Sequence, residues 1–129
     1  MASFDLDWEG TTDEQAFKAQ TKAIALRTSK PAEVLPPPSI GDVLGKQLLR
    51  SATSVGANYR AVCRAKSPAD MIDKLHIVEK EADESGYWPD SIGESRLMPY
   101  ERVADLMREF REITAMVVAS QKTLRPNVP

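Results

Sequence analysis

The sequence predicts an all-α protein, an antiparallel up-and-down four-helix bundle, and three observations support this fold class. Four long segments place apolar residues three and four positions apart, which is the spacing of one helix face. A polar restart, Ser67-Pro68-Ala69-Asp70, separates the second segment from the third. The connections between segments are short, and short connections make consecutive helices antiparallel neighbours.

The length and composition fit one soluble domain. The 129 residues are enough to bury a core without disulfides or metal. We expect a bundle over residues 12–123, a flexible leader at residues 1–11 and a flexible tail at residues 124–129. The sequence has no run of about 18 apolar residues, so we expect no membrane span. The N-terminal residues lack the pattern of a secretory signal, which predicts a cytoplasmic protein.

The leader alternates apolar and acidic residues. Phe4, Leu6 and Trp8 are separated by acids at positions 5, 7 and 9. This alternation also suits a short strand, but no nearby segment offers a strand partner. The three apolar side chains would serve as anchors if the leader docks on another surface.

The first helix has a weak inner face and two alternative ends. It is expected to start at Thr11 or Thr12, which are suitable N-cap residues. Pro31 lacks the amide hydrogen that a helix interior needs. The helix therefore either ends near Ser29 or kinks and continues to Leu35. Its expected inner face consists of Phe17, Thr21, Ile24, Ala25 and Thr28.

The second helix is expected to begin between Ser39 and Asp42, after a connector with three consecutive prolines, and to run to about Arg64. Its inner stripe is Leu44, Leu48, Ala52, Val55, Tyr59 and Val62.

Small residues cluster on this second helix. They are Ser51, Ala52, Ser54, Gly56, Ala57 and Asn58. Glycine weakens a helix interior, which suggests that another backbone passes close to Gly56. The alternative is a ligand notch lined by Ser51, Ser54 and Asn58.

The third helix is expected to start at Pro68. Ser67 is placed to accept the Asp70 amide, and the Asp70 carboxylate faces the positive end of the helix. A kink or an end is expected just before Pro89. The inner stripe is Met71, Leu75, Val78 and Ala82.

The last helix is the plainest amphipathic segment, and it begins at Pro99. Its seam repeats like a heptad through Val103, Leu106, Met107, Phe110, Ile113, Thr114, Val117 and Ser120.

Charge is divided unevenly along the chain, although the net charge is only −2. Residues 12–66 contain nine Lys or Arg and four Asp or Glu, whereas residues 67–129 contain eight and twelve. The simple interpretation is two solvated faces of one bundle. The sharper interpretation is a pair of complementary surfaces that meet between subunits.

No pattern in the sequence indicates catalysis, a cofactor or a metal. The sequence has no glycine-rich phosphate loop, no paired-cysteine zinc pattern and no nucleophile elbow. His76 follows Asp73 in the acid-x-x-His spacing of di-metal bundles, but it is the only histidine. We interpret it as a surface or interface residue. Cys63, the only cysteine, is expected to be a buried thiol rather than a nucleophile.

Charged side chains on the second and third helices are the candidate interaction residues. Tyr59 is considered for base stacking beside these cations. The acids either face solvent or pair with cations, within the chain or between subunits. The candidates are Lys46, Arg50, Arg60, Arg64, Lys66, Glu79, Asp83 and Glu84.

Several motifs resemble a known family. The segments SATSVGANYR, RAKS and KLHIVEKEADES are similar to the four-helix-bundle proteins associated with intervening sequences in 23S ribosomal RNA. Weaker similarity through QAFKAQTKAIALR, YERVADLMRE and AMVVASQKT extends it over residues 12–123. This sequence departs from the family where Ser29-Lys30-Pro31 replaces apolar helix, and where Gly86, Pro89, Ser91 and Gly93 replace most of a leucine-rich segment.

The resemblance implies a small cytosolic bundle that assembles into a five-subunit ring and has no established enzymatic activity. It also implies relatives that accompany diversity-generating retroelements and bind a reverse transcriptase and nucleic acid through a basic surface. Two functions are therefore expected for this chain. The first is a non-enzymatic homo-oligomeric scaffold, and the second is a nucleic-acid-binding accessory module. No small-molecule substrate is expected.

Overall fold

The computed structural model describes residues 14–34, 40–94 and 98–129. The leader at residues 1–11, the threonine caps at 11 and 12, and the proline connector that ends at Ser39 lie outside the described residues. No strand occurs in the described ranges.

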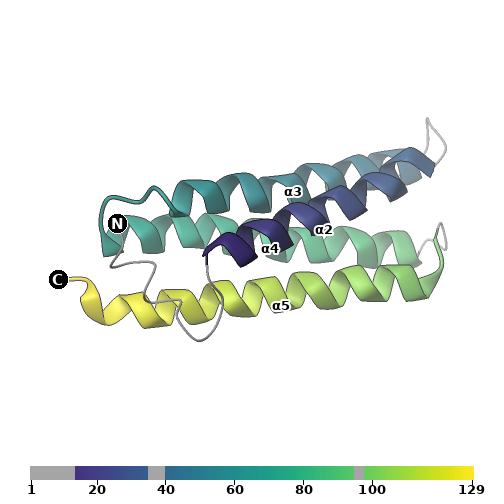
Figure 1. Cartoon of the computed structure of the whole chain (residues 1–129). Coiled ribbons are helices and arrows are strands. Elements are labelled where there is room, and N and C mark those ends of the chain that lie inside the picture. Colours follow the sequence, from purple (N-terminus) through teal and green to yellow (C-terminus); the bar gives the residue numbers. More distant parts are fainter. Residues whose placement is uncertain (1–13, 35–39, 95–97) are drawn as a thin grey trace.

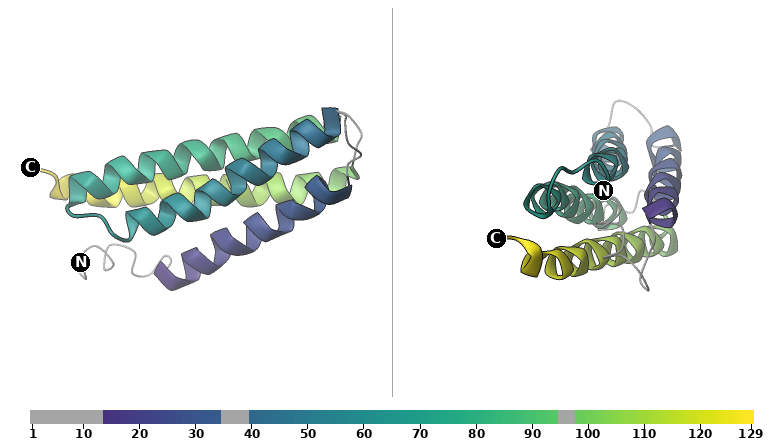
Figure 2. Two further views of the ribbon diagram at one scale, coloured as in Figure 1. Left: turned by 90° about the horizontal axis from the view of Figure 1, so that it is seen from above. Right: turned by 60° about the vertical axis from the view of Figure 1, so that its left-hand side comes forward.

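Four helices lie side by side in up-and-down order (Figures 1 and 2). They are α2 (Glu14–Val34), α3 (Ile40–Val62), α4 (Pro68–Glu94) and α5 (Tyr100–Leu124), and a short 3-10 helix, η2 (Arg125–Asn127), follows them. The C-terminal ends of α2 and α4 lie at one end of the bundle, together with the N-terminal ends of α3 and α5, and the α3–α4 turn lies at the other end (Figure 1). The predicted four-helix bundle is confirmed. Leu124, which was expected to start the tail, is instead the last residue of α5 and is fully buried.

The predicted inner stripes form the core. Every residue of the expected stripes on α3 and α4 is buried, and so are the five inner residues of α2. On α5, Met107, Thr114 and Ser120 are only partly buried, at the edge of the seam. Helical periodicity predicts burial here because each stripe faces a neighbouring helix.

Two helices continue past prolines. α2 runs beyond Pro31 to Val34, and α4 runs beyond Pro89 to Glu94. The prolines therefore end neither helix. At Pro89 the lost backbone hydrogen bond costs about 3 kcal/mol in a helix interior, but the proline is itself buried, and Ile92, one turn further on, is 1% exposed. Burial of these two side chains offsets the missing bond.

Helix α2 packs chiefly on α3 and much less on α5. At the α2–α3 crossing, a Cβ built on Gly56 would lie 3.9 Å from the backbone carbonyl carbon of Thr21. The α2 backbone therefore passes next to Gly56, as one of the two interpretations expected, and a Cβ at this position would still make only an ordinary contact. Arg27 of α2 forms an ion pair with Glu109 of α5 and links the two helices across the less packed side.

Within the described residues, no helix is long and apolar enough to cross a membrane.

Candidate interaction surfaces

The α3–α4 turn fixes the end of the basic surface. The Ser67 hydroxyl accepts the Asp70 amide at 3.0 Å, and the Lys66 amide donates to the Asp70 carboxylate at 2.9 Å. The bond to Ser67 confirms the predicted cap, and the bond from the Lys66 amide ties the residue before the cap to the first turn of α4. The Lys74 ammonium, which donates to Asp70, and the Lys66 amide hold the pKa of the Asp70 carboxyl below its usual value. The turn therefore has a fixed backbone from which Arg64 and Lys66 project.

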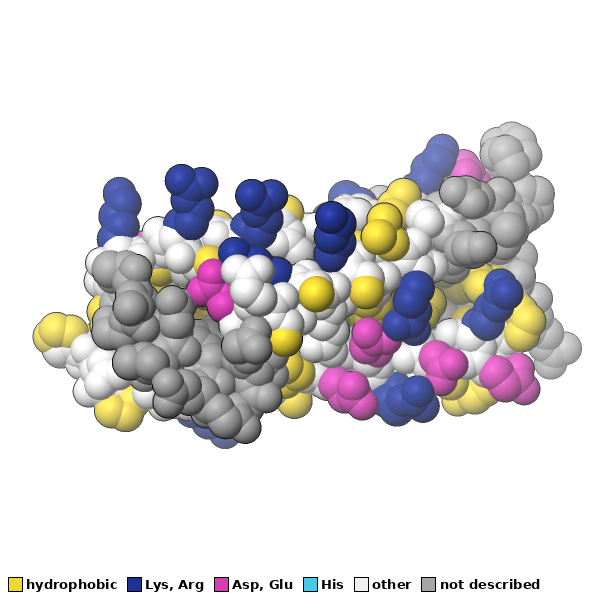
Figure 3. Space-filling view, in the orientation of Figure 1, with side chains coloured by type: hydrophobic (Ala, Val, Ile, Leu, Met, Phe, Trp, Pro, Cys, Tyr) yellow, Lys and Arg dark blue, Asp and Glu magenta, His cyan; other side chains and the backbone are white. Residues whose placement is uncertain are grey.

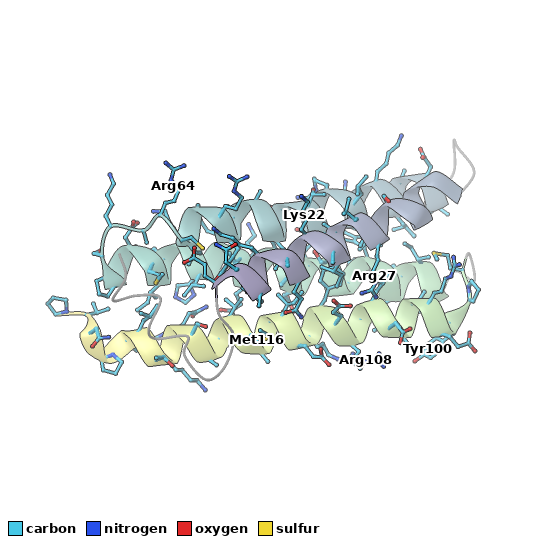
Figure 4. The ribbon with its side chains drawn as sticks, in the orientation of Figure 1. Lys22, Arg27, Arg64, Tyr100, Arg108 and Met116 are labelled. Atoms are coloured by element: carbon cyan, nitrogen blue, oxygen red, sulfur yellow. The ribbon has the colours of Figure 1, made fainter. Side chains whose placement is uncertain are left out.

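Three cations near the C-terminal end of α3 form a basic ridge, which we define as Arg60, Arg64 and Lys66. All three side chains are exposed, and none forms an ion pair with another described residue. In Figure 3, Lys and Arg side chains line the edge of the molecule that carries α3, and in Figure 4 the labelled Arg64 points away from the bundle. The basic ridge is therefore a positive surface that no described residue neutralises through an ion pair.

The other two candidate cations are paired within the chain. Lys46 forms an ion pair with Asp42 at 3.0 Å, one turn away on the same helix. Arg50 reaches across to α4, where it lies 2.6 Å from Glu84 and 3.8 Å from Glu81. For Arg50 and Glu84 the structure thus favours the intrachain alternative.

Helix α4 is the acidic helix of the bundle, with eight carboxylates and two lysines, whereas α3 has one carboxylate and three cations. Glu79 accepts a hydrogen bond from the Gln121 amide at 2.8 Å and lies 3.7 Å from the Nδ1 atom of His76. Asp83 is exposed and forms no ion pair with another described residue. Of the three acidic candidates, Asp83 is the one most available to another molecule.

Tyr59 does not serve as a stacking platform. It is 1% exposed and makes an edge-to-face contact with Phe17, with ring centroids 4.5 Å apart. The expectation that it stacks on a base was wrong, because its place on the apolar stripe of α3 turns it toward α2 and away from solvent.

The polar side chains of the proposed ligand notch already form hydrogen bonds within α3. The Ser51 hydroxyl donates to the carbonyls of Gln47 and Leu48, and the Asn58 amide donates to the carbonyl and hydroxyl of Ser54. Ser51 is also fully buried. These bonds leave little polar capacity for a ligand, so close helix packing is the better interpretation.

A groove that the sequence interpretation missed runs between α2 and α3 on the outer side of the bundle. It has a volume of about 420 Å³. Leu26 and Leu49, which contribute to its floor, lie off the predicted inner stripes, and Leu26 is 63% exposed. The sequence offered one sign of this groove: Leu26 directly follows Ala25 of the predicted inner face, so a large apolar side chain lies outside that face.

Cys63 and His76 lie in different surroundings. Cys63 was expected to be buried and is only partly buried. Desolvation raises the pKa of its thiol to about 12, with the Glu14 carboxylate as the next cause, which disfavours the thiolate at neutral pH. His76 is about half exposed beside Glu79. Among the residues that the structure describes, no three His, Cys, Asp or Glu side chains are grouped as metal ligands would be.

These features define an antiparallel four-helix bundle with charged outer surfaces and an apolar interior filled by side chains. The family model of the 23S rRNA-intervening sequence protein matches residues 18–119, so the chain belongs to this family. The resemblance stated from the sequence is confirmed.

A solved relative has the same fold. The crystal structure of a protein of unknown function from the S23 ribosomal protein family of Bacteroides thetaiotaomicron VPI-5482 is 31% identical in sequence, with a TM-score of 0.76. The match covers 84% of this chain and 97% of the other. A comparison with curated proteins finds no match.

Proposed function

We propose that this protein is a cytoplasmic, non-enzymatic scaffold or interaction protein that assembles with copies of itself through surfaces of opposite charge. The expected assembly is a ring of five, the number that the family resemblance implies. The observation that carries the proposal is the division of charge between α3 and α4.

A ring requires two different surfaces on each copy, because one face of a subunit meets another face of the next. The basic ridge offers exposed cations without ion pairs to described residues, and α4 offers the exposed carboxylate of Asp83. Glu79 and Glu84 lie one turn before it and directly after it on the same helix. Apposition of these two surfaces would lower the repulsion among the acids of α4.

Light scattering after gel filtration tests the assembly. At micromolar concentration we expect a mass close to five times the chain mass of 14.3 kDa. A purely monomeric species under these conditions contradicts the proposal.

Charge reversals test the surfaces. Arg64→Glu and Asp83→Arg should each shift the population toward smaller species, and a loss of about 1.4 kcal/mol at the interface would weaken assembly tenfold. Arg125→Glu is the matched control, because Arg125 is an exposed cation of η2, outside the basic ridge. An unchanged assembly in both test variants would remove these surfaces from the interface.

The second candidate function is a nucleic-acid-binding accessory module, alone or beside a nucleic-acid enzyme. The exposed row of Lys46, Arg60, Arg64 and Lys66 favours it, since cations that follow a phosphate backbone bind by releasing counterions. With Tyr59 buried, base stacking would not contribute through this residue. Binding would then be insensitive to sequence and strongly dependent on salt.

Fluorescence anisotropy with a labelled single strand separates the two functions. We expect affinity to fall steeply as salt rises, and Arg64→Glu to weaken binding more than the Arg125→Glu control does. If no salt-sensitive affinity is measured near physiological ionic strength, the nucleic-acid function is excluded, and the scaffold function is unaffected.

A further inference from the structure

The groove between α2 and α3 combines an apolar floor with a positive rim. Ala25, Leu26, Leu49 and Ala57 contribute apolar atoms to it. Leu26 is 63% exposed, which leaves a large apolar side chain in water at the centre of the α2 side. In Figure 3, hydrophobic side chains lie among the Lys and Arg side chains on this face. Such a surface gains stability when an apolar segment covers it.

All the described charged residues that line the groove are cations. Lys18, Lys22 and Arg60 line the groove, and no described carboxylate does. Lys18 is already bound to Glu14 at 3.2 Å, but Lys22 and Arg60 form no ion pair with a described residue. In Figure 4, Lys22 lies over the place where α2 and α3 run together. An occupant with both apolar and acidic side chains would therefore fit this groove better than a purely apolar one.

We propose that the N-terminal segment Phe4-Asp5-Leu6-Asp7-Trp8-Glu9 of the same chain occupies this groove. Apolar and acidic residues alternate along the segment. In an extended backbone, alternate side chains point to opposite sides, so the apolar side chains would contact the floor together. The flexible stems of Lys22 and Arg60 would then reach past the floor to the acids.

The length of the chain suits this arrangement. The groove begins at Lys18, one helical turn after Glu14, where the described chain starts. From Lys18 to Ser29 the α2 side of the groove is about 17 Å long at the rise of an α-helix. Six extended residues cover about 20 Å. Residues 10–13, which start with Gly10, are then available to reverse the direction of the chain.

Carbodiimide cross-linking of the full chain tests the proposal. The reagent joins a carboxylate to a lysine amine in contact with it, as an amide, with loss of water. We expect mass spectrometry to find Asp5, Asp7 or Glu9 joined to Lys22 at least about fivefold more often than to Lys80, because contact raises the effective concentration of the pair. Lys80 is the matched control, an exposed lysine on α4 outside the groove.

A pair of variants tests the apolar floor. Leu26→Asp should reduce the cross-link to Lys22 about fivefold, since an added carboxylate repels the acids of the segment. Ile77→Asp is the control, because Ile77 is also an exposed apolar side chain but lies on α4. Neither side chain belongs to the core, so both variants are expected to fold. Equal yields at Lys22 and Lys80, or an unchanged yield in Leu26→Asp, would overturn the proposal.

A mixture of isotopically labelled and unlabelled copies identifies the occupant. If every cross-linked pair is either fully labelled or fully unlabelled, the segment docks within its own chain. Mixed products would show that the segment of a second copy fills the groove, and would overturn the intrachain assignment. The test does not depend on the proposed scaffold function, because its outcome is independent of the subunit number measured by light scattering.

Discussion

Helix α2 and the unit formed by α3, α4 and α5 differ in how they are held. In the unit, consecutive helices share long interfaces and contribute large buried side chains such as Leu75, Phe110 and Ile113. Helix α2 has one extensive neighbour, α3. Two of its buried positions are Thr21 and Thr28, whose hydroxyls donate to carbonyls of α2 itself.

This difference shows that a weakly amphipathic helix can pack in a bundle and still leave an open groove beside its neighbour. The threonines bury surface but bring fewer apolar atoms than leucines would. The groove on the outer side of α2 and α3 is the consequence, because the two helices meet closely at Gly56 and leave Leu26 exposed. We therefore expect the three-helix unit to determine global stability and α2 to open locally first.

The largest expected effect is at the α4–α5 interface. Phe110→Ala should lower the free energy of unfolding by about 3–5 kcal/mol, because it empties a large buried site where the side chain is 1% exposed. Urea unfolding followed by circular dichroism measures it. Tyr87→Ala, at a 60% exposed aromatic residue of α4, is the control and should change stability by only about 0.5 kcal/mol. If Phe110→Ala lowers the free energy of unfolding no more than Tyr87→Ala does, the α4–α5 interface does not carry the stability that the comparison assigns to the three-helix unit.

Ile24→Ala removes a fully buried side chain of α2. We expect a loss of about 2–3 kcal/mol, at the lower end for such substitutions because the groove lets the site relax. Amide hydrogen exchange should become faster in α2 and stay unchanged in α4 and α5. Uniformly faster exchange in all four helices would show instead that α2 unfolds only together with the rest.

Gly56→Ala should stabilise the α2–α3 contact by about 0.5–1 kcal/mol through the higher helix propensity of alanine. The added Cβ would lie 3.5 Å from the Thr21 hydroxyl oxygen, an ordinary contact. Gly93→Ala is the matched comparison in α4, where the Cβ would lie only 3.1 Å from Val103. Thermal melting should show a higher midpoint for Gly56→Ala than for Gly93→Ala, and the reverse order would refute the packing argument.

The smallest effect concerns pH at the α3–α4 turn. The pKa of Asp70 is lowered in the folded protein, first by the hydrogen bond from Lys74. A lowered folded pKa contributes stability that is fully present above the unfolded value and is lost as pH falls through the folded value. Asp70→Asn should therefore be less stable than the wild type at pH 7, with a smaller difference in acid. Urea midpoints at several pH values measure this, and a constant difference would exclude Asp70 as the titrating group.

Much of the fold was predictable because helix periodicity and capping are local properties. The stripes on α3 and α4 were predicted residue by residue, and so was the Ser67 cap. The candidate surfaces were less predictable. Tyr59 was assigned both to the α3 stripe and to base stacking, and its burial leaves only the first assignment. The pairing of Arg50 with Glu84 depends on the register between α3 and α4, which the sequence does not give.

The sequence by itself determined the four amphipathic helices, the turn between the second and third described helices, and the division of charge along the chain. These depend on residues at most a few positions apart, so they can be read without knowing the neighbours. Only the tertiary structure decided that α4 passes through Pro89 and that Leu26 lines an open groove. Both outcomes depend on which atoms another helix brings against a site, and burial by a partner distant in sequence outweighs local propensity.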